Sequence, residues 1–272
     1  MAKIDEKDIK TDENGIKLYR PEDFEGMRRA GKLAAECLDY ITDFVDVGVT
    51  TEHLDNLCRE FIVSHNAIPS CLGYHGYPKT ICTSINHVIC HGIPDDRKLA
   101  DGDIVNIDVT VTLDGWFGDT SRMYYIGKPK LKATRLCEVT YECLMRGIDV
   151  VKPGAHFGDI GAVIEYAHKY GYSVVEMFCG HGLGRVFHDE PNVLHFGRKG
   201  TGPVIKEGMF FTIEPMINIG KPDGTILSNG WTAVTRDRTL SAQFEHSLGV
   251  TKDGCEVFTY SPKGLDKPPY KK

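Results

Sequence analysis

The chain has 272 residues, of which 41% are hydrophobic and 26% are charged, and its formal net charge at pH 7 is -6. This composition is typical of a globular protein and excludes a disordered or fibrous chain. No apolar run approaches the roughly 18 residues of a membrane span, and the acidic balance argues against a surface built mainly to bind DNA. The length corresponds to one large domain or two small ones.

The first half of the chain predicts two helices followed by strands. Residues 1–20 are polar, which predicts a flexible N-terminal arm. A helix is expected to begin at Pro21, because proline and the acids that follow it suit a first turn, and apolar spacing continues it to Phe44. A second helix is expected from Thr51, and strands are expected over residues 81–85 and 103–113.

The second half repeats this order. Helices are predicted over residues 133–151 and 157–170, and strands over 173–178, 209–217, 225–235 and 242–250. The repetition predicts an α+β fold in which residues 21–260 form one domain of two similar halves around one sheet system. Residues 261–272 form a basic tail rich in proline and lysine, which we expect to be mobile.

The cysteines and the N-terminus bear on the compartment. The nine cysteines are scattered and form no Cys-x-x-Cys pair, so free thiols are expected rather than disulfides or a zinc ribbon. The N-terminus alternates charges and has no apolar core, unlike a secretory signal. Together these features predict a cytoplasmic protein.

Two acids are brought together by a predicted hairpin. Asp114-Gly115 between two extended runs is a strong signal for a two-residue turn. That register places Thr110 opposite Asp119, so Asp108 and Asp119 become diagonal neighbours on one face, roughly 7–8 Å apart at the backbone. Such a pair repels unless a cation lies between the carboxylates. The alternative is two solvated acids on an exposed face.

Further acids and histidines complete a candidate site. Glu214 and Glu245 lie in strand-like apolar segments, where a carboxylate needs a partner; the alternative to a metal is an ion pair with Arg236 or Arg238. His181 is predicted in a glycine-rich loop after a strand. The negative charges of four carboxylates would balance two divalent cations, and oxygen ligands with a single imidazole favour manganese, iron or cobalt over a thiolate zinc site. Each histidine taken alone is more often a structural residue.

Six segments together resemble the methionine aminopeptidases of type I, in their short bacterial or organellar form, within peptidase family M24. The resemblance runs from about Pro21 to Thr259. The matching segments are Cys90-His-Gly-Ile-Pro, Gly102-Asp-Ile-Val-Asn-Ile-Asp108, Gly118-Asp119-Thr, Cys179-Gly-His-Gly-Leu-Gly, Phe211-Thr-Ile-Glu-Pro-Met and Ser241-Ala-Gln-Phe-Glu-His.

The resemblance implies a pita-bread fold with internal pseudo-two-fold symmetry around a central antiparallel sheet system, and two divalent metal ions (Co, Mn, Fe or Zn). Asp108 would bind one ion, and His181 and Glu214 the other. Asp119 and Glu245 would bridge both ions. It also implies removal of the initiator methionine from nascent proteins whose second residue is small, by hydrolysis of the first peptide bond with water held between the metals.

The resemblance also implies roles for the surrounding side chains. Glu214 would carry the proton, His188 would contact the scissile carbonyl and His91 the scissile amide. The methionine side chain would be held by a pocket of sulfur and aromatic groups, in line with the packing preferences of a thioether; the alternative is that these are ordinary core residues. The pocket residues would be Cys71, Tyr74, Tyr77, Cys82, Phe187 and Trp231.

Three other functions are alternatives to this one. A proline-directed peptidase of the same fold usually carries a large additional N-terminal domain, and a non-catalytic pita-bread protein that binds partners would be free to lose metal ligands. A cysteine hydrolase based on Cys90 and His91 is disfavoured, because adjacent residues on a strand point to opposite faces. The expected partners are nascent polypeptide N-termini, with ribosome contact through the basic tail as a hypothesis, no DNA, no membrane and a monomeric state.

Overall fold

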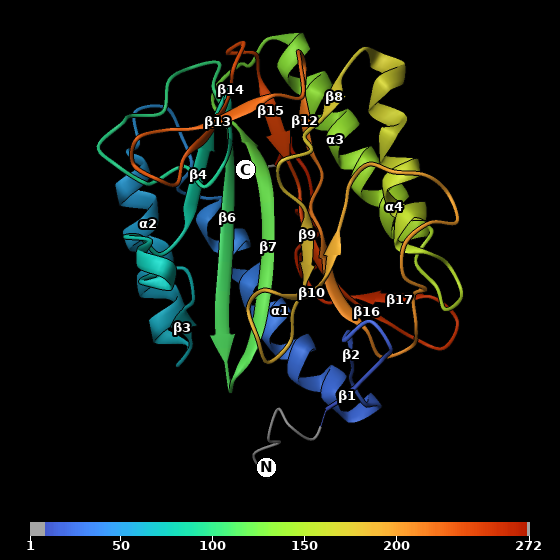
Figure 1. Ribbon diagram of the computed structural model, residues 1–272. Coiled ribbons are helices and arrows are strands. Elements are labelled where there is room, and N and C mark those ends of the chain that lie inside the picture. Colours follow the sequence, from blue (N-terminus) through green and yellow to red (C-terminus); the bar gives the residue numbers. More distant parts are fainter. Residues whose placement is uncertain (1–8, 271–272) are drawn as a thin grey trace.

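The computed structural model describes residues 9–270 and shows two helix pairs packed around antiparallel strands (Figure 1). Helices α1 (Phe24–Ile41) and α2 (Thr51–Ser64) belong to the first half of the chain, and α3 (Leu131–Asp149) and α4 (Phe157–Ile164) to the second. Short 3-10 helices precede α1, follow α4 and lie between α2 and the first long strand; they are η2 (Pro21–Asp23), η4 (Glu165–Tyr170) and η3 (Tyr74–Gly76). The helix predicted over residues 157–170 is therefore divided into α4 and η4.

A long hairpin organises the first half. Its strands are β6 (Ile104–Leu113) and β7 (Trp116–Tyr125), and β3 (Ile68–Pro69) and β4 (Cys82–Ile85) pair with β6 along its other edge. The short strands elsewhere, which complete the small sheets, are β1 (Lys10–Thr11), β2 (Lys17–Leu18), β5 (Val88–Cys90), β8 (Ser173–Val174), β13 (Gly224–Ile226) and β14 (Ala233–Thr235).

The second half is built on two further antiparallel sheets. One has the order β10 (Asp189–Val193), β9 (Gly180–Gly182), β11 (Phe210–Ile213), β16 (His246–Val250) and β17 (Cys255–Val257). The other has the order β15 (Ser241–Gln243), β12 (Met216–Asn218) and β8. A bridge between Ser121 and Glu245 joins this half to β7, so the sheets of the two halves meet at the centre.

Each half has its own hydrophobic core. Leu38 of α1, Leu54 of α2 and Val109 of β6 are fully buried in one cluster. Leu144 of α3 and Phe211 of β11 are fully buried in another. This doubled arrangement confirms the α+β prediction of two similar halves.

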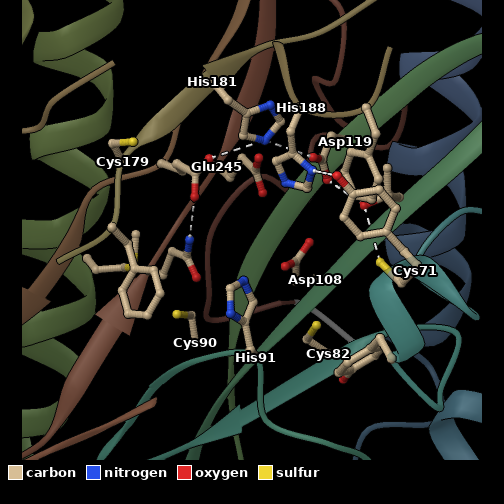
Figure 2. Close-up of a pocket in the computed structure, with 18 of the residues that line it drawn as sticks. Cys71, Cys82, Cys90, His91, Asp108, Asp119, Cys179, His181, His188 and Glu245 are labelled. Atoms are coloured by element: carbon tan, nitrogen blue, oxygen red, sulfur yellow. Dashed lines mark hydrogen bonds and ion pairs between the residues drawn. The ribbon is translucent and has the colours of Figure 1, made fainter. Parts of the chain in front are cut away.

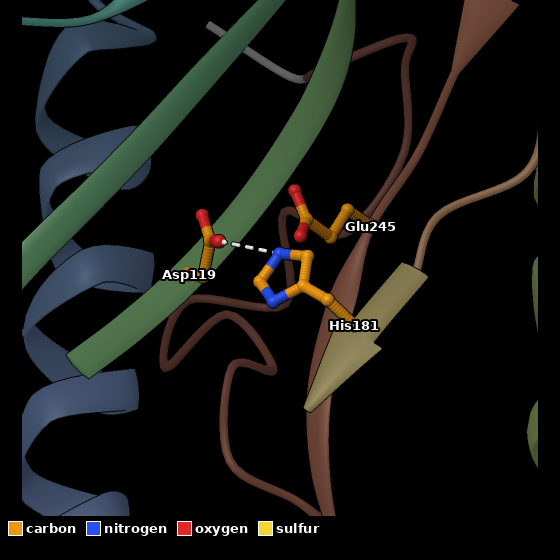
Figure 3. Close-up of side chains that lie close together, drawn as sticks. All are labelled: Asp119, His181 and Glu245. Atoms are coloured by element: carbon orange, nitrogen blue, oxygen red, sulfur yellow. Dashed lines mark ion pairs between the residues drawn. The ribbon is translucent and has the colours of Figure 1, made fainter. Parts of the chain in front are cut away.

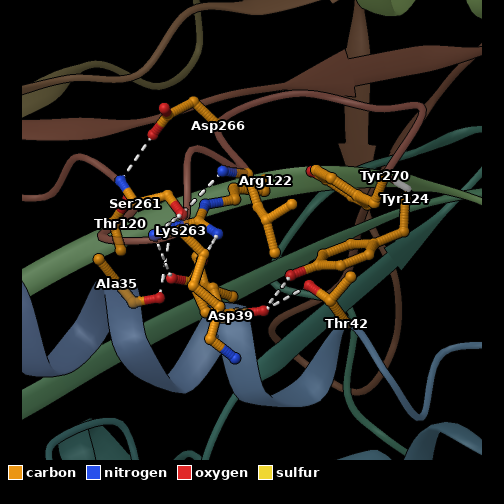
Figure 4. Close-up of polar contacts among 12 residues, drawn as sticks. Ala35, Asp39, Thr42, Thr120, Arg122, Tyr124, Ser261, Lys263, Asp266 and Tyr270 are labelled. Atoms are coloured by element: carbon orange, nitrogen blue, oxygen red, sulfur yellow. Dashed lines mark hydrogen bonds and ion pairs between the residues drawn. The ribbon is translucent and has the colours of Figure 1, made fainter. Parts of the chain in front are cut away.

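Helix α1 lies directly on β7 because a glycine faces it. A Cβ atom built on Gly118 would lie 2.2 Å from the carbonyl oxygen of Ala30, closer than any real side chain allows. The apolar face of α1 is buried as its spacing predicts. A buried ion pair strengthens the same contact: Arg122 Nη1 donates to Asp39 Oδ1 at 2.6 Å, and Asp39 also accepts from Ser261 Oγ at 2.7 Å (Figure 4).

Two predicted strands are interrupted, and the interruptions matter for function. The apolar run 209–217 divides at Glu214 into β11 and β12, which belong to different sheets. Pro215 has no N–H and so cannot continue the ladder. The run 242–250 divides in the same way just before β16, at Glu245. Both glutamates therefore lie between strands, where side chains no longer alternate between the two faces of a sheet.

The other strand predictions are corrected in part. Only Ser173–Val174 of the run 173–178 pairs with another strand, and residues 225–235 form the hairpin of β13 and β14 rather than one strand. The nine cysteines are free thiols, as predicted.

Residues of the predicted flexible arm and of the predicted mobile tail pack against the rest of the protein. Tyr19 is buried and its ring stacks on that of Phe210, with centroids 4.4 Å apart. Near the other end, the Tyr270 hydroxyl donates to the Met123 carbonyl oxygen at 2.8 Å. Residues 1–8 of the predicted arm and residues 271–272 of the predicted tail lie outside the described residues. Within residues 9–270, no helix combines the length and apolarity that crossing a membrane requires.

Candidate active site

The β6–β7 hairpin places two acids as the turn predicts. Asp114 and Gly115 both have positive φ, 51° and 75°, as a two-residue turn of the favoured type demands. Thr110 pairs with Asp119 and Asp108 with Ser121, so Asp108 and Asp119 are diagonal neighbours on one face. The Thr110 hydroxyl donates to Asp119 Oδ1 at 2.8 Å, which orients that carboxylate.

His181 lies on a strand, not in a loop. It is the middle residue of β9, flanked by glycines on which there is no room for a side chain: a Cβ on Gly182 would lie 2.0 Å from the Glu190 carbonyl oxygen. His181 Nδ1 lies 3.0 Å from the carbonyl oxygen of Gly182. Because a carbonyl only accepts, the proton is on Nδ1, and Nε2 is free to act as a ligand.

Asp119 and Glu245 each place a carboxylate oxygen near the His181 ring (Figure 3). One ligand atom each from Asp119, His181 and Glu245 lie within 4.8 Å of one another. His181 Nε2 lies 3.5 Å from Asp119 Oδ2 and 3.6 Å from Glu214 Oε1. Glu245 is held by its backbone, since its N–H donates to the Ser121 carbonyl oxygen at 3.1 Å.

The electrostatics of this group fit divalent cations. Burial, followed by the nearby charge of Asp119, raises the pKa of Asp108 and of Glu245 well above the usual range. Burial likewise raises the pKa of Glu214 to about 7. Asp108 Oδ1 is buried and has no hydrogen-bond partner among the described residues. Crowded, buried carboxylates of this kind need a positive charge between them.

Nearby cationic side chains do not supply that charge. Among residues 9–270, those that line the surrounding cavity include no lysine or arginine. Glu214 accepts hydrogen bonds from Thr212 Oγ1 at 2.8 Å and from Gln243 Nε2 at 3.2 Å. The arginine partners considered as an alternative for Glu214 are therefore not its hydrogen-bond partners.

The candidate site opens into one cavity of about 660 Å³ (Figure 2). All of the predicted site residues line it, so the structure brings them together, while their individual roles stay predictions. They are Cys71, Tyr74, Tyr77, Cys82, His91, Asp108, Asp119, His181, Phe187, His188, Glu214, Trp231 and Glu245. One wall is aromatic and sulfur-rich: the ring centroids of Tyr74 and Phe187 lie 4.7 Å apart, and Tyr77 packs edge-on against Trp231 at 5.1 Å.

The two remaining predicted histidines are neutral at pH 7. Burial lowers the pKa of His188 to about 4 and also lowers the pKa of His91. His188 Nδ1 lies 2.8 Å from the Tyr74 hydroxyl, which leaves Nε2 available for a ligand. Burial raises the pKa of the neighbouring Cys90 thiol well above its ordinary value, which argues against a thiolate nucleophile there.

Four residues that hydrogen-bond to the candidate site residues Asp119 and Glu214 were not predicted from the sequence. Thr110 and Thr212 hold the carboxylates of Asp119 and Glu214, and each lies two residues from a predicted ligand, a spacing that alternation along a strand makes visible. Gln243 has the same spacing from Glu245, although the carboxylate that it holds is that of Glu214. His195 carries no such signal, because it reaches Glu214 from the segment that follows β10. His195 is fully buried, and burial lowers its pKa to about 3.

Comparisons with known proteins agree with this geometry. The family model of metallopeptidase family M24 matches residues 25–252. A protein named methionine aminopeptidase from Rickettsia prowazekii is 64% identical over 258 residues, which cover 94% of this chain and 99% of the relative. A crystal structure of methionine aminopeptidase from Rickettsia prowazekii has a TM-score of 0.89 and 63% identity, covering 90% of this chain and 99% of that one.

The comparison with a prolidase bears on the proline-directed alternative. Prolidase from Pyrococcus furiosus is 21% identical with a TM-score of 0.70, and the match covers 89% of this chain and 65% of that one. This likeness shows a shared fold alone, whereas the 64% identity to the Rickettsia protein spans almost the whole of both chains. The chain belongs to metallopeptidase family M24 and, within it, to the methionine aminopeptidases.

Proposed function

We propose that this chain hydrolyses the first peptide bond of proteins that begin with methionine followed by a small residue. The observation that carries the proposal is the position of the buried carboxylate–histidine group of Asp108, Asp119, His181, Glu214 and Glu245, beside an aromatic and sulfur-rich wall in one cavity. Nascent polypeptide N-termini are the substrate class, as the names of the relatives suggest.

The same five residues are the proposed ligands of two divalent ions. Asp108 would hold one ion, His181 and Glu214 would hold the other, and Asp119 and Glu245 would serve both. Cobalt, manganese, iron and zinc all suit such ligands. When bound, divalent ions supply Lewis acidity, which polarises the scissile carbonyl and lowers the pKa of water.

Glu214 is the proposed proton carrier. Its pKa of about 7 suits a group that takes up and releases a proton near neutral pH. Thr212 and Gln243 each hold one oxygen of its carboxylate, so the group keeps its direction while its proton moves.

Neutral His188 and His91 are the proposed substrate contacts. His188 is oriented through Nδ1 by the Tyr74 hydroxyl, so Nε2 can donate to the carbonyl oxygen of the scissile bond. His91, whose pKa is also lowered by burial, lies on the wall of the same cavity and contacts the leaving amide.

The aromatic and sulfur-rich wall is the proposed methionine pocket. A methionine thioether gains about 0.3–1.5 kcal/mol from each good sulfur–aromatic contact. Cys71 and Cys82 close the pocket with small, buried thiols, and Tyr74, Tyr77, Phe187 and Trp231 supply the rings. A charged or branched side chain gains less from such a wall.

We also propose a cytoplasmic monomer that contacts the ribosome through its basic C-terminal segment. The tail contains four lysines, of which Lys263 and Lys267 are described. Charge reversal at both positions would weaken salt-sensitive co-sedimentation with ribosomes. Unchanged co-sedimentation of the double variant would contradict this contact.

The activity is tested with the peptides Met-Ala-Ser, Met-Lys-Ser and Met-Pro-Lys. Released methionine is measured by mass spectrometry for metal-free protein and after addition of Mn²⁺, Fe²⁺ or Co²⁺. Metal-dependent release from Met-Ala-Ser but not Met-Lys-Ser, lost in Glu214→Gln, is the expected result. Release from Met-Pro-Lys alone would support a proline-directed peptidase, and no release by folded protein a binding protein.

A further inference from the structure

The backbone at Glu214 has a donor that the sheet does not satisfy. Strand β11 pairs with β16 up to Ile213, opposite His246. The chain then leaves the ladder, and Pro215 follows. Glu214 N–H is therefore beyond the last strand pair, in a buried part of the molecule where an unpaired donor costs about 1–3 kcal/mol.

One side chain accepts this hydrogen bond. His195 Nε2 lies 3.0 Å from the Glu214 nitrogen, two residues after the end of β10. Because Nε2 accepts, the imidazole is neutral with its proton on Nδ1. His195 is fully buried, and its Nδ1 has no partner among the described residues. The hydrogen bond to Glu214 is thus the polar interaction that this buried ring makes within residues 9–270.

The other contacts of Glu214 act on a different part of the residue. Thr212 and Gln243 hold the two oxygens of its carboxylate, whereas His195 holds its main chain. Thr212 Oγ1 additionally accepts from the His181 N–H at 3.0 Å, which ties the β9 backbone to the same carboxylate. A shift of the Glu214 main chain would displace the carboxylate relative to His181.

We propose that His195 is a positioning residue for metal binding and catalysis: it fixes the Glu214 main chain at the strand break and thereby places the Glu214 carboxylate beside His181. The inference rests on the proposed role of Glu214 as a metal ligand. Groups that orient metal ligands typically change metal affinity or activity 10- to 100-fold when they are removed.

Three variants of His195 separate the hydrogen bond from the packing of the ring. In His195→Gln the side-chain carbonyl reaches the place of Nε2 and still accepts from Glu214 N–H. His195→Leu has a similar volume without an acceptor. His195→Asn is polar but shorter, so its amide falls short of that place. His195→Asn and His195→Gln differ by one methylene, so they can be compared even where His195→Leu lowers the yield of folded protein.

Affinity for Mn²⁺ is measured by isothermal titration of metal-free protein, and kcat and KM are measured with Met-Ala-Ser. His195→Asn and His195→Leu are expected to weaken Mn²⁺ binding at least tenfold and to lower kcat with little change in KM, while His195→Gln stays within about threefold of the wild type. Thermal unfolding of each variant in chelator shows that it is folded.

The inference is overturned if His195→Asn or His195→Leu keeps its Mn²⁺ affinity and kcat within twofold of wild type. It is also overturned if His195→Gln loses as much as His195→Asn. Glu214→Gln, titrated in parallel, distinguishes this failure from that of the proposed site. If Glu214→Gln binds Mn²⁺ as wild type does, Glu214 is not a ligand and the basis of the inference is also removed.

Discussion

Replacing Asp39 by alanine tests the buried ion pair that joins α1 to β7. Asp39 and Arg122 are 2% and 1% exposed. Within residues 9–270, the substitution leaves the guanidinium with the Ala35 carbonyl oxygen, 3.3 Å from Nη2, as its remaining hydrogen-bond acceptor. Removing one partner of such a pair costs about 3–5 kcal/mol, because a buried charge is left uncompensated.

That cost corresponds to a fall in Tm of roughly 6–20 °C for a chain of this size, at about 2–4 °C per kcal/mol. Urea unfolding followed by circular dichroism, with metal held constant, gives the free energy of unfolding directly. The matched control is Glu256→Ala, which removes the partner of Arg28 in a much more exposed ion pair (2.6 Å) and is expected to cost at most about 1 kcal/mol.

A second variant distinguishes the unpaired charge from lost packing. Asp39→Leu combined with Arg122→Met replaces the pair by apolar groups and is expected to recover most of the stability, as apolar replacements of buried pairs often do. A loss below about 1 kcal/mol in Asp39→Ala would refute the reasoning, since it would mean that the Arg122 charge is solvated or compensated elsewhere.

Three further predictions concern packing and protonation. Gly118→Ala should destabilise the fold by several kcal/mol and lower Tm, because its Cβ would meet the Ala30 backbone at 2.2 Å; an unchanged Tm would contradict the close approach. Tyr19→Ala should cost about 3–5 kcal/mol in urea unfolding, the range for a buried aromatic, whereas a loose arm would lose almost nothing. In chelator, Glu214→Gln should become increasingly more stable than wild type as pH rises from 4.5 to 7, because the folded protein holds a proton on Glu214 up to about pH 7 while the unfolded chain releases it at its ordinary 4.5. A difference in unfolding free energy that is flat across this range would show that the Glu214 pKa is not raised.

The sequence predicts best what is determined locally. The Asp114-Gly115 turn sets the register of β6 and β7, so the placement of Asp108 and Asp119 follows from the chain itself. The helices follow from apolar periodicity, and their bounds differ by a few residues from those expected. The other proposed ligands, His181, Glu214 and Glu245, also stand in short segments that are recognised from the sequence.

What could not be predicted depends on contacts between distant segments. The breaks at Glu214 and Glu245 arise because the chain passes from one sheet to another, and an apolar run looks the same whether it stays in one sheet or changes. A residue such as His195 is recognised only from its distance to Glu214, and the contact between Gln243 and Glu214 likewise appears only in the structure. The packing of Tyr19 on Phe210 likewise joins positions far apart in the chain.

The proposed ligand group draws on both halves of the chain, and this has a consequence for folding. Asp108 and Asp119 belong to the first half, while His181, Glu214 and Glu245 belong to the second, so neither half alone can assemble the group. Contacts of such long sequence separation are expected to form late, after their loop-closure entropy has been overcome. A metal ion bound there would act as a cross-link between the halves, stabilising the native state by mass action and slowing its unfolding.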